Sequence, residues 1–413
     1  MTPEVKKRID QIRQGIVPEG YKKTESGIIP NEWRVEQVSK CIEEYKFFSN
    51  DISHIPVYSS SRKGLVPQSD YYNQREAVET NLGYKVVPQG YVTYRHMSDD
   101  DVFHFNINKT GENVLVSSEY PVFTSSDNCD LSFLISVLNN TARFRYFCKM
   151  QKLGGTRTRL YLDNLKRYAL ALPPFDEQKK IAEILATQDK AIELQGRKIE
   201  ELKRFKKGCL EKMFPRKGQK VPEKRFPGFT DDWEQRKFEE IAVRSSVICS
   251  DANLPRVEYE DIVSGAGRLN KDIYTKESSK SGIAFHQGDV LYGKLRPYLQ
   301  NWLLPAFDGL AVGDFWVLQP QNADSSFLYR LIQSRQFDEV ANQSTGTKMP
   351  RADWKLVSKT VFSIPSNISE QAAIGTYFTA LDNLITLHQR KLEEMKNQKK
   401  ALMQLLLTGI VRV

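Results

Sequence analysis

The most regular pattern in the sequence is a seven-residue repeat of apolar positions in two long segments. Both sets of apolar residues fall at the a and d positions of one shared heptad register, which favours long helices that pack as a coiled coil. The residues are Leu185, Ile192, Ile199, Leu202, Cys209 and Met213 in the first segment, and Phe378, Leu381, Ile385, Leu392, Met395, Leu402 and Leu406 in the second.

Polar residues interrupt both heptad segments at matching positions, Gln195 with His388 and Lys206 with Lys399. Inward polar residues of this kind set the register of a coiled coil at some cost in stability. A helix from Asp176 to Phe214 would be about 58 Å long at ~1.5 Å per residue. The pattern predicts long spacer helices, and the simpler alternative is a local hairpin that only holds two domains together.

About 140 residues of mixed pattern accompany each heptad segment. Short β-branched and aromatic runs among Gly and Pro predict strands at 84–87, 290–292 and 310–312. Helical periodicity at 131–147 and 326–340 predicts helices in the same regions. Two mixed α/β domains are therefore expected.

The chain repeats itself. Glu177-Gln178 recurs as Glu370-Gln371, and this offset of 193 residues holds without a gap for more than thirty residues of the helical segments. Upstream, the copies match with shifting offsets; for example, Asn31-Glu32-Trp33 corresponds to Asp231-Asp232-Trp233 at an offset of 200. Shifting offsets indicate insertions and deletions, which is how surface loops diverge on a shared scaffold.

The repeat continues across the chain ends. The segment from Lys399 to Val411 resembles the segment from Lys6 to Val17, as if the chain were a cut circle. We therefore predict an α+β fold in which two α/β domains are joined by long antiparallel coiled-coil helices, with a pseudo-twofold circular repeat and neighbouring termini. The predicted parts are an N-terminal segment at 1–30, domains at 31–172 and 215–364, and spacer helices at 173–214 and 365–413.

Composition narrows the class of partner. The 413 residues carry a net charge of +9, which points toward a polyanion, of which nucleic acid is the favoured kind. On charge alone, a basic protein with no special partner is an equal alternative. No apolar run is long enough for a membrane helix, and Met1 to Gly20 has no secretory apolar core. Five scattered cysteines without a CxxC pair fit a reducing compartment, so a cytoplasmic location without a membrane partner is expected.

Catalytic and cofactor motifs are missing from the sequence. There is no GxxxxGK[ST], no strand-coupled GxGxxG and no HExxH, so we expect no catalytic residues, metal or cofactor in this chain. The run Leu172-Pro173-Pro174-Phe175 resembles the catalytic loop of amino-methyltransferases, but leucine replaces its polar residue, and a lead-in to a helix explains it better. His96 and His104 flank three aspartates, which we interpret as a solvated acidic turn rather than a metal site.

Two places in each copy combine basic, hydroxyl, glycine and aromatic residues. Glycines let a backbone approach phosphates, Thr, Lys and Arg donate to phosphate oxygens, and Arg reads guanine in the major groove. The alternative is an ordinary basic loop. The candidate DNA-binding residues are Tyr94, Arg95, Lys152, Thr156, Arg157 and Arg159 in the first copy and Lys294, Arg296, Tyr298, Thr347, Lys348 and Arg351 in the second.

The whole pattern resembles the specificity subunit (HsdS) of Type I restriction–modification enzymes. The resemblance is carried by the two proline-to-Glu-Gln passages, the Trp33 and Trp233 signatures, and the helical repeats. It is also carried by the run from Gly288 to Pro297, whose Gly-Lys-Leu-Arg-Pro part the first copy lacks.

This resemblance implies that each mixed domain is a target recognition domain that reads one half of a bipartite, asymmetric double-stranded DNA site. The helices would set the spacing and dock two methyltransferase (M) subunits, and restriction (R) subunits would join the full complex. S-adenosylmethionine, ATP and Mg would bind only to those partners. Two other hypotheses remain at this point: a single-chain DNA methyltransferase or nuclease, and a coiled-coil adaptor that binds only protein.

Overall fold

A computed structural model describes residues 2–68, 83–152, 154–216, 218–274, 279–343 and 349–413. The chain forms two compact units. The first combines Met1–Leu194 with Glu393–Val413, and the second comprises Gln195–Leu392. Both ends of the chain therefore belong to one unit, as a circular repeat requires.

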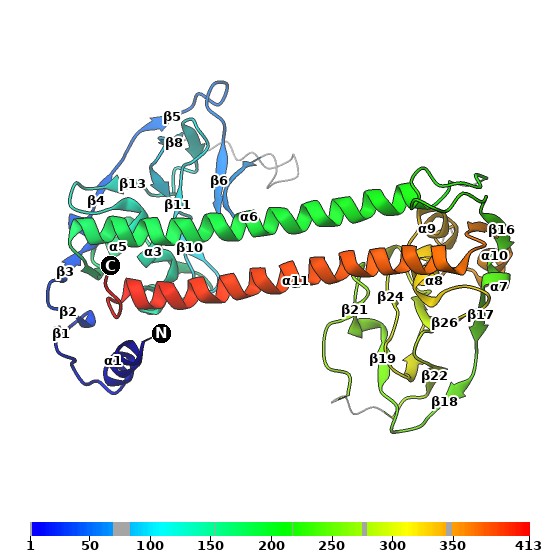
Figure 1. Ribbon diagram of the computed structural model, residues 1–413. Coiled ribbons are helices and arrows are strands. Elements are labelled where there is room, and N and C mark those ends of the chain that lie inside the picture. Colours follow the sequence, from blue (N-terminus) through cyan, green and yellow to red (C-terminus); the bar gives the residue numbers. More distant parts are fainter. Residues whose placement is uncertain (1, 69–82, 153, 217, 275–278, 344–348) are drawn as a thin grey trace. The chain divides into compact units, whose positions relative to one another are not determined.

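Two long helices dominate the element order, α6 (Phe175–Met213) and α11 (Ile368–Leu407), and each runs from one unit into the other (Figure 1). Within each unit, the segments of α6 and α11 run antiparallel. In the second unit, Gln195 contacts His388 while Lys206 contacts Asp382, so the residue numbers change in opposite directions. The predicted antiparallel pairing of the helices is confirmed.

Within its described residues, the first unit contains a short N-terminal helix, small sheets and further short helices. Its elements are α1 (Pro3–Arg13), β1 (Tyr21–Thr24), β2 (Gly27–Pro30), β3 (Arg34–Gln37), η1 (Val38–Lys40), β4 (Ile42–Glu44), β5 (Phe48–Ser49), β6 (Tyr58–Ser61), β7 (Gly64–Pro67), β8 (Tyr84–Val87), β9 (Val92–Thr93), β10 (Met97–Ser98), β11 (Asn106–Ile107), β12 (Val114–Val116), β13 (Val122–Ser125), α3 (Leu131–Asn140), α4 (Ala142–Lys149), β14 (Thr158–Arg159), α5 (Leu162–Lys166) and β15 (Ala169–Leu172).

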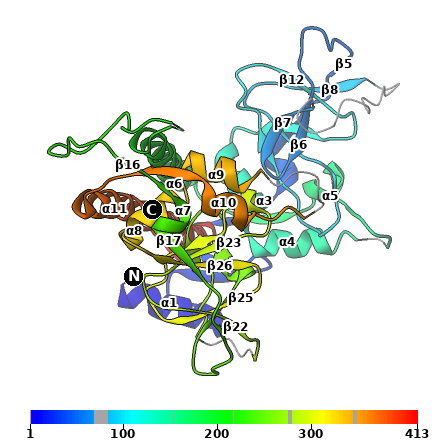
Figure 2. The same ribbon diagram turned by 90° about the vertical axis from the view of Figure 1, so that its right-hand side faces the viewer.

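The strands of the first unit form sheets in the orders β11-β9-β13-β4 and β12-β8-β5, together with the pairs β1-β2, β6-β7, β10-β14 and β15-β3. Figure 2 shows β6, β7, β8 and β12 grouped on one side of this unit. Its core packs Trp33, Phe105, Phe133 and Phe144 against Ile181 and Leu185 of α6 and Leu406 of α11.

The second unit repeats this plan with its own strands. Its elements are β16 (Glu234–Lys237), α7 (Phe238–Ile241), β17 (Ala242–Ser245), β18 (Ile248–Cys249), β19 (Arg256–Glu258), η2 (Tyr259–Asp261), β20 (Ile262–Val263), β21 (Arg268–Leu269), β22 (Gly282–Phe285), β23 (Val290–Gly293), η3 (Pro297–Leu299), β24 (Trp302–Leu303), β25 (Gly309–Val312), β26 (Phe315–Pro320), α8 (Ser325–Leu331), α9 (Arg335–Ala341), α10 (Trp354–Lys359) and β27 (Val361–Ile364).

Sheets of the second unit have the orders β17-β26-β23-β24 and β18-β22-β25-β19, and β16 pairs with β27 as β3 pairs with β15 in the first unit. Among the described strands of this unit, all pairs are antiparallel except β19 with β25. The core packs Trp233, Trp316, Phe327 and Phe337 against Phe378 of α11. Both units are mixed α/β domains, as predicted.

Each of the two predicted intradomain helices is broken into two. At 131–147, Thr141 adopts an extended conformation and separates α3 from α4. At 326–340, α8 ends at Leu331, and Ser334 begins α9 by accepting a hydrogen bond from Phe337 N at 3.4 Å. Hydroxyl side chains favour the start of a helix over its interior, and apolar periodicity alone did not reveal the break.

Candidate nucleic-acid interface

In the first unit, strand pairing brings the two candidate segments together. Met97 pairs with Arg159 and Ser98 with Thr158 where β10 meets β14, and Leu160 N donates to His96 O at 2.8 Å. Arg95, Lys152, Thr156, Arg157 and Arg159 are all exposed. Residues more than fifty positions apart in the chain thus lie close to one another.

The second unit makes the same connection with different residues. Ala352 N donates to Lys294 O at 2.8 Å, and an isolated bridge pairs Leu295 with Arg351. This hydrogen bond matches the one between Leu160 and His96, so Arg351 is the backbone equivalent of Arg159. Tyr298 and Arg351 are exposed and Lys294 and Arg296 half-buried, whereas Thr347 and Lys348 lie outside the described residues.

Tyr94 differs from the other described candidates because it is fully buried. Its hydroxyl donates to Leu160 O at 3.0 Å, and its ring lies 4.5 Å from that of Phe105. Burial raises the pKa of this phenol well above its usual value. Tyr94 therefore anchors the connection between β9 and β10, which carries Arg95, and offers no exposed surface itself. The sequence pattern alone could not separate these roles.

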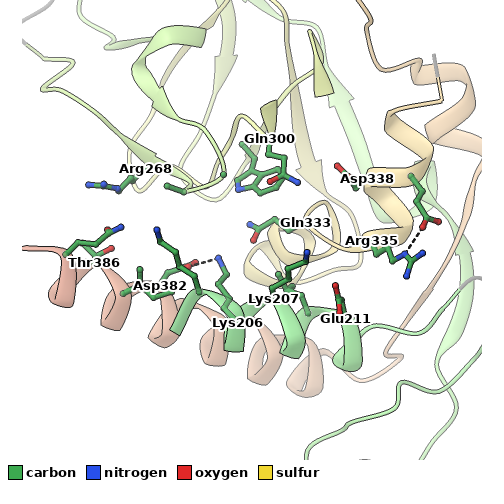
Figure 3. A pocket seen from close by; sticks show the side chains of 18 residues that line it. Lys206, Lys207, Glu211, Arg268, Gln300, Gln333, Arg335, Asp338, Asp382 and Thr386 are labelled. Atoms are coloured by element: carbon green, nitrogen blue, oxygen red, sulfur yellow. Dashed lines mark hydrogen bonds and ion pairs between the residues drawn. The ribbon is translucent and has the colours of Figure 1, made fainter. Parts of the chain in front are cut away.

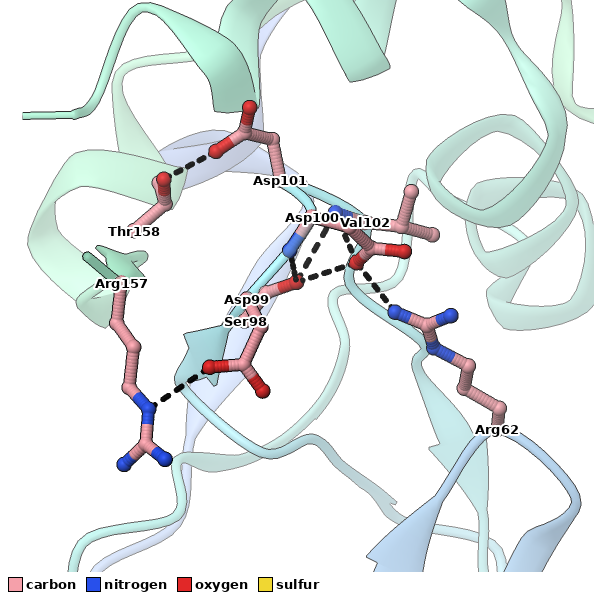
Figure 4. Close-up of polar contacts among 8 residues, drawn as sticks. All are labelled: Arg62, Ser98, Asp99, Asp100, Asp101, Val102, Arg157 and Thr158. Atoms are coloured by element: carbon pink, nitrogen blue, oxygen red, sulfur yellow. Dashed lines mark hydrogen bonds and ion pairs between the residues drawn. The ribbon is translucent and has the colours of Figure 1, made fainter.

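Carboxylates hold several basic side chains of the first unit (Figure 4). Arg157 Nε donates to Asp99 Oδ1 at 2.8 Å, Arg62 donates to Asp100, and Thr158 donates to Asp101. Burial acts to raise the pKa of Asp100, but the hydrogen bonds from Arg62 and Ser98 outweigh it and lower that pKa. Arg62, in the turn between β6 and β7, was not singled out from the sequence because it lies far from both candidate segments.

One carboxylate of the second unit likewise binds basic side chains. Asp314 accepts from Arg351 Nη2 at 3.1 Å and lies 3.6 Å from Lys294 Nζ. Burial acts to raise the pKa of Asp314, but Arg351 and Lys294 outweigh it and hold that pKa below its usual value. Asp314 therefore joins the two candidate segments of this unit.

Left-handed backbone conformations mark both surfaces. Asp101 has φ 62°, and Arg296 and Gln300, which flank η3, have φ 49° and 55°. Such conformations are costly for residues other than glycine and persist where surrounding contacts impose them. Here Arg296 N donates to Pro350 O at 2.7 Å and so ties the η3 loop to the segment that carries Arg351.

The aspartates of the acidic turn bind side chains of the first unit. Among the described residues, no group of three or more His, Cys, Asp or Glu is placed to hold a metal ion. His96 is buried and stacks on Tyr161 at 5.5 Å. Burial lowers the pKa of both His96 and His104. The aspartates between these histidines bind Arg62, Arg157 and Thr158 instead.

The repeated Glu-Gln pair ties each domain to the start of a long helix. Gln178 Oε1 accepts from Asp130 N at 2.8 Å, and Gln371 Oε1 accepts from Asp324 N at 2.8 Å. Asp130 and Asp324 are the N-caps of α3 and α8. Each glutamine also donates back to a proline carbonyl, Pro173 O at 3.0 Å or Pro365 O at 2.8 Å. The Leu172-Pro173-Pro174-Phe175 run is thus a structural junction.

The glutamates of the same pair accept from a tryptophan and an arginine. Trp233 Nε1 donates to Glu370 at 3.2 Å, and Arg225 donates to both its oxygens at 2.6 and 2.7 Å. In the first unit, Trp33 Nε1 donates to Glu177 at 3.0 Å, and Arg412 binds the same carboxylate. The sequence revealed the tryptophans and glutamates but neither arginine, since the two arginines occupy unrelated places in the chain.

The predicted a and d side chains of the long helices are buried or half-buried. Leu185, Ile199, Phe378 and Ile385 are buried, and Ile192, Leu202, Leu392 and Met395 are half-buried.

The polar residues at the inward positions of the long helices find partners across the helix pair. Gln195 Nε2 donates to His388 O at 2.9 Å, Lys206 binds Asp382 at 2.6 Å, and Lys399 binds Asp189.

A cavity of about 710 Å³ lies within the second unit, between the long helices and the loops around η3 and α9. Figure 3 shows Lys206 and Lys207 of α6 directed toward its far side, where Gln300 and Gln333 lie. Acidic residues, including Asp338 and Asp382, also line it. Its charges have both signs, so they do not define one ligand.

Among the described helices, none combines the length and the apolar character that a membrane span requires.

The fold and the candidate site together define a class of protein. In this class an α/β domain occurs twice, each copy brings two basic segments together, and two long antiparallel helices accompany the domains. The family model described as the Type I restriction modification DNA specificity domain matches residues 38–204 and 231–397. The chain belongs to this family and contains its domain twice.

Individual relatives carry the same description. The chain is 26% identical over 275 residues to the Type I restriction enzyme MjaVIII specificity subunit of Methanocaldococcus jannaschii, covering 61% of this chain and 63% of the relative. It is 22% identical to the putative type I restriction enzyme MjaX specificity subunit of the same organism, covering 96% and 97%. The chain thus spans slightly less than two thirds of the first relative and nearly all of the second.

A solved structure supports the fold. The S subunit of a Type I restriction–modification system from M. genitalium has a TM-score of 0.52 with this chain at 13% sequence identity. The match covers 91% of this chain and 96% of the other. The predicted family resemblance and fold class are confirmed.

Proposed function

We propose that this chain is the DNA sequence-specificity subunit of a Type I restriction–modification complex, in which each α/β domain reads one half of a bipartite, asymmetric site. The observation that carries this proposal is the repeated connection between candidate segments. In both units one backbone hydrogen bond of 2.8 Å, Leu160 to His96 or Ala352 to Lys294, places basic residues from two separate segments on one surface.

Methyl transfer, translocation and cleavage belong to partner subunits in this proposal. Two methyltransferase subunits dock on the long helices, and restriction subunits complete the assembly, in the cytoplasm. S-adenosylmethionine, ATP and Mg bind to those partners, and this chain performs no catalysis. The relatives are named as specificity subunits of type I restriction enzymes, which supports an assembly with other subunits. The family match disfavours a protein-only adaptor and a single-chain enzyme.

Methylation mapping tests the proposal. Genomic DNA from the host should contain a bipartite methylated motif that disappears when this gene is removed and returns when the wild-type gene is restored. Purified alone, the chain should transfer no methyl group. A methylome that does not depend on this gene would overturn the proposal.

A further inference from the structure

Arginines on the candidate surface of the first unit differ in whether a carboxylate already holds them. Arg157 is bound by Asp99 and Arg62 by Asp100. Arg95 and Arg159 are exposed and have no carboxylate partner within the part of the chain that the structure describes. Figure 4 shows Arg62 and Arg157 on opposite sides of the turn from Ser98 to Val102.

The contact between Arg157 and Asp99 orients the arginine and leaves its fork available. Only Nε donates to the carboxylate, at 2.8 Å, so the two terminal nitrogens remain for a planar acceptor pair. The side chains of Arg157 and Asp99 are 53% and 69% exposed, so DNA can reach them without rearrangement. Guanine presents such a pair, O6 and N7, in the major groove.

The same ion pair is poorly suited to a phosphate. Arg157 and Asp99 together carry no net charge, so their approach to a phosphate would release few counterions and would bring two anions together. A base edge carries no charge, and an arginine that is already held loses less conformational entropy on binding. An arginine that is held through Nε alone therefore suits base reading, and unpaired arginines suit phosphates.

We infer that Arg157, oriented by Asp99, reads a guanine in the half-site of the first domain. Arg62 binds Asp100 through its terminal Nη2, so its fork is already in use and no base is assigned to it. Arg95 and Arg159 bind phosphates. This assignment rests on the proposed function and divides the basic residues into those that determine specificity and those that supply affinity.

The second domain holds a cation at a different position. Arg351, the equivalent of Arg159, donates to Asp314 through Nε at 3.4 Å and Nη2 at 3.1 Å. The held arginine thus directly precedes β14 in the first domain and lies at the strand bridge in the second. Because Arg351 already uses Nε and Nη2 for Asp314, it does not have both terminal nitrogens free, and the base-reading assignment is confined to the first domain.

The test uses the complex of the full chain with its methyltransferase partner and a duplex that carries the wild-type motif. Each guanine of the motif is replaced in turn by 7-deazaguanine, which lacks only N7. At one guanine the wild-type complex should bind roughly 5- to 150-fold more weakly. This sensitivity should disappear in Arg157→Gln and decrease in Asp99→Asn.

Matched variants separate specificity from affinity. Arg159→Gln should weaken binding to all sequences and reduce the slope of log K against log salt by about 1, whereas Arg157→Gln should change that slope much less. Arg13→Gln, on α1 and outside both candidate segments, removes the same charge and should change neither quantity.

The outcomes distinguish this inference from the proposed function. If the wild-type gene yields no motif, the proposed function fails. If a motif exists but every guanine keeps its 7-deazaguanine sensitivity in Arg157→Gln, or if its salt slope falls as much as that of Arg159→Gln, only the inference is overturned. Should Arg157→Gln not fold, Arg157→Lys decides the matter, because it keeps the charge and loses the fork.

Discussion

The two units form the same contact with arginines that occupy different places in the chain. In the second unit Arg225 precedes its tryptophan, Trp233, by eight residues, whereas in the first unit Arg412 and Trp33 lie near the two termini. Both arginines nevertheless bind the glutamate at the start of a long helix, Glu370 or Glu177. The contact is therefore a property of the repeat and not of the order in which the chain supplies its parts.

The equivalent ion pairs of the two units differ in how far their side chains are exposed to solvent. Arg225 has 14% of its side chain exposed and Arg412 has 34%. Asp382 has 27% exposed and is also bound by the buried Arg330 at 2.7 Å, whereas Asp189 has 60% exposed. The same residue types should therefore contribute more stability in the second unit, where water screens them less.

The largest expected effect is at the glutamates. Glu370→Ala should destabilise the second unit by about 3–5 kcal/mol, because it leaves Arg225 and Trp233 Nε1 without their acceptor. Glu177→Ala should cost less, since water can reach Arg412. Hydrogen exchange at the first turns of α6 and α11 measures each effect locally. Glu183→Ala, at an exposed position of α6, is the control; equal losses in the two units would contradict the comparison.

An intermediate effect is expected at the aspartates of the helix pair. Asp382→Asn should cost about 2–3 kcal/mol because it removes the carboxylate charge that Lys206 and Arg330 both bind. Asp189→Asn removes an exposed pair and should cost less than about 1 kcal/mol. Unfolding in urea, monitored through hydrogen exchange of the amides of α11, measures the loss of stability in each variant. A cost at Asp189 as large as that at Asp382 would show that exposure does not control these pairs.

The smallest effect concerns a cysteine of the first unit. Burial raises the pKa of Cys148 to about 12. At pH 8 its thiolate fraction is then about one in ten thousand, so native Cys148 should resist iodoacetamide while the half-buried Cys249 of the second unit reacts. Peptide mass spectrometry after brief alkylation measures both.

The same shift predicts a dependence of stability on pH. The folded state keeps the Cys148 proton to a higher pH than the unfolded chain, whose thiol titrates near 9. Its contribution to stability is therefore complete below about pH 9 and falls as the pH rises toward 12. Cys148→Ser should make the stability of the first unit less sensitive to pH in that range.

Local patterns predicted the scaffold well and the surfaces less well. Strands at 84–87, 290–292 and 310–312 and both long helices were visible because their periodicity reflects one buried face. The breaks at Thr141 and Ser334 were missed, because apolar spacing continues across them. Arg62 was missed because its partner, Asp100, lies 38 residues away.

The sequence by itself determined the duplication, the heptad register and the absence of the catalytic motifs that were sought. Each of these is a relation between residue types at fixed spacing, which a linear chain records directly. Only the tertiary structure decided which arginine meets which carboxylate, and that Tyr94 faces the core. Those outcomes depend on side-chain direction, burial and contacts between distant segments, which the order of residues does not specify.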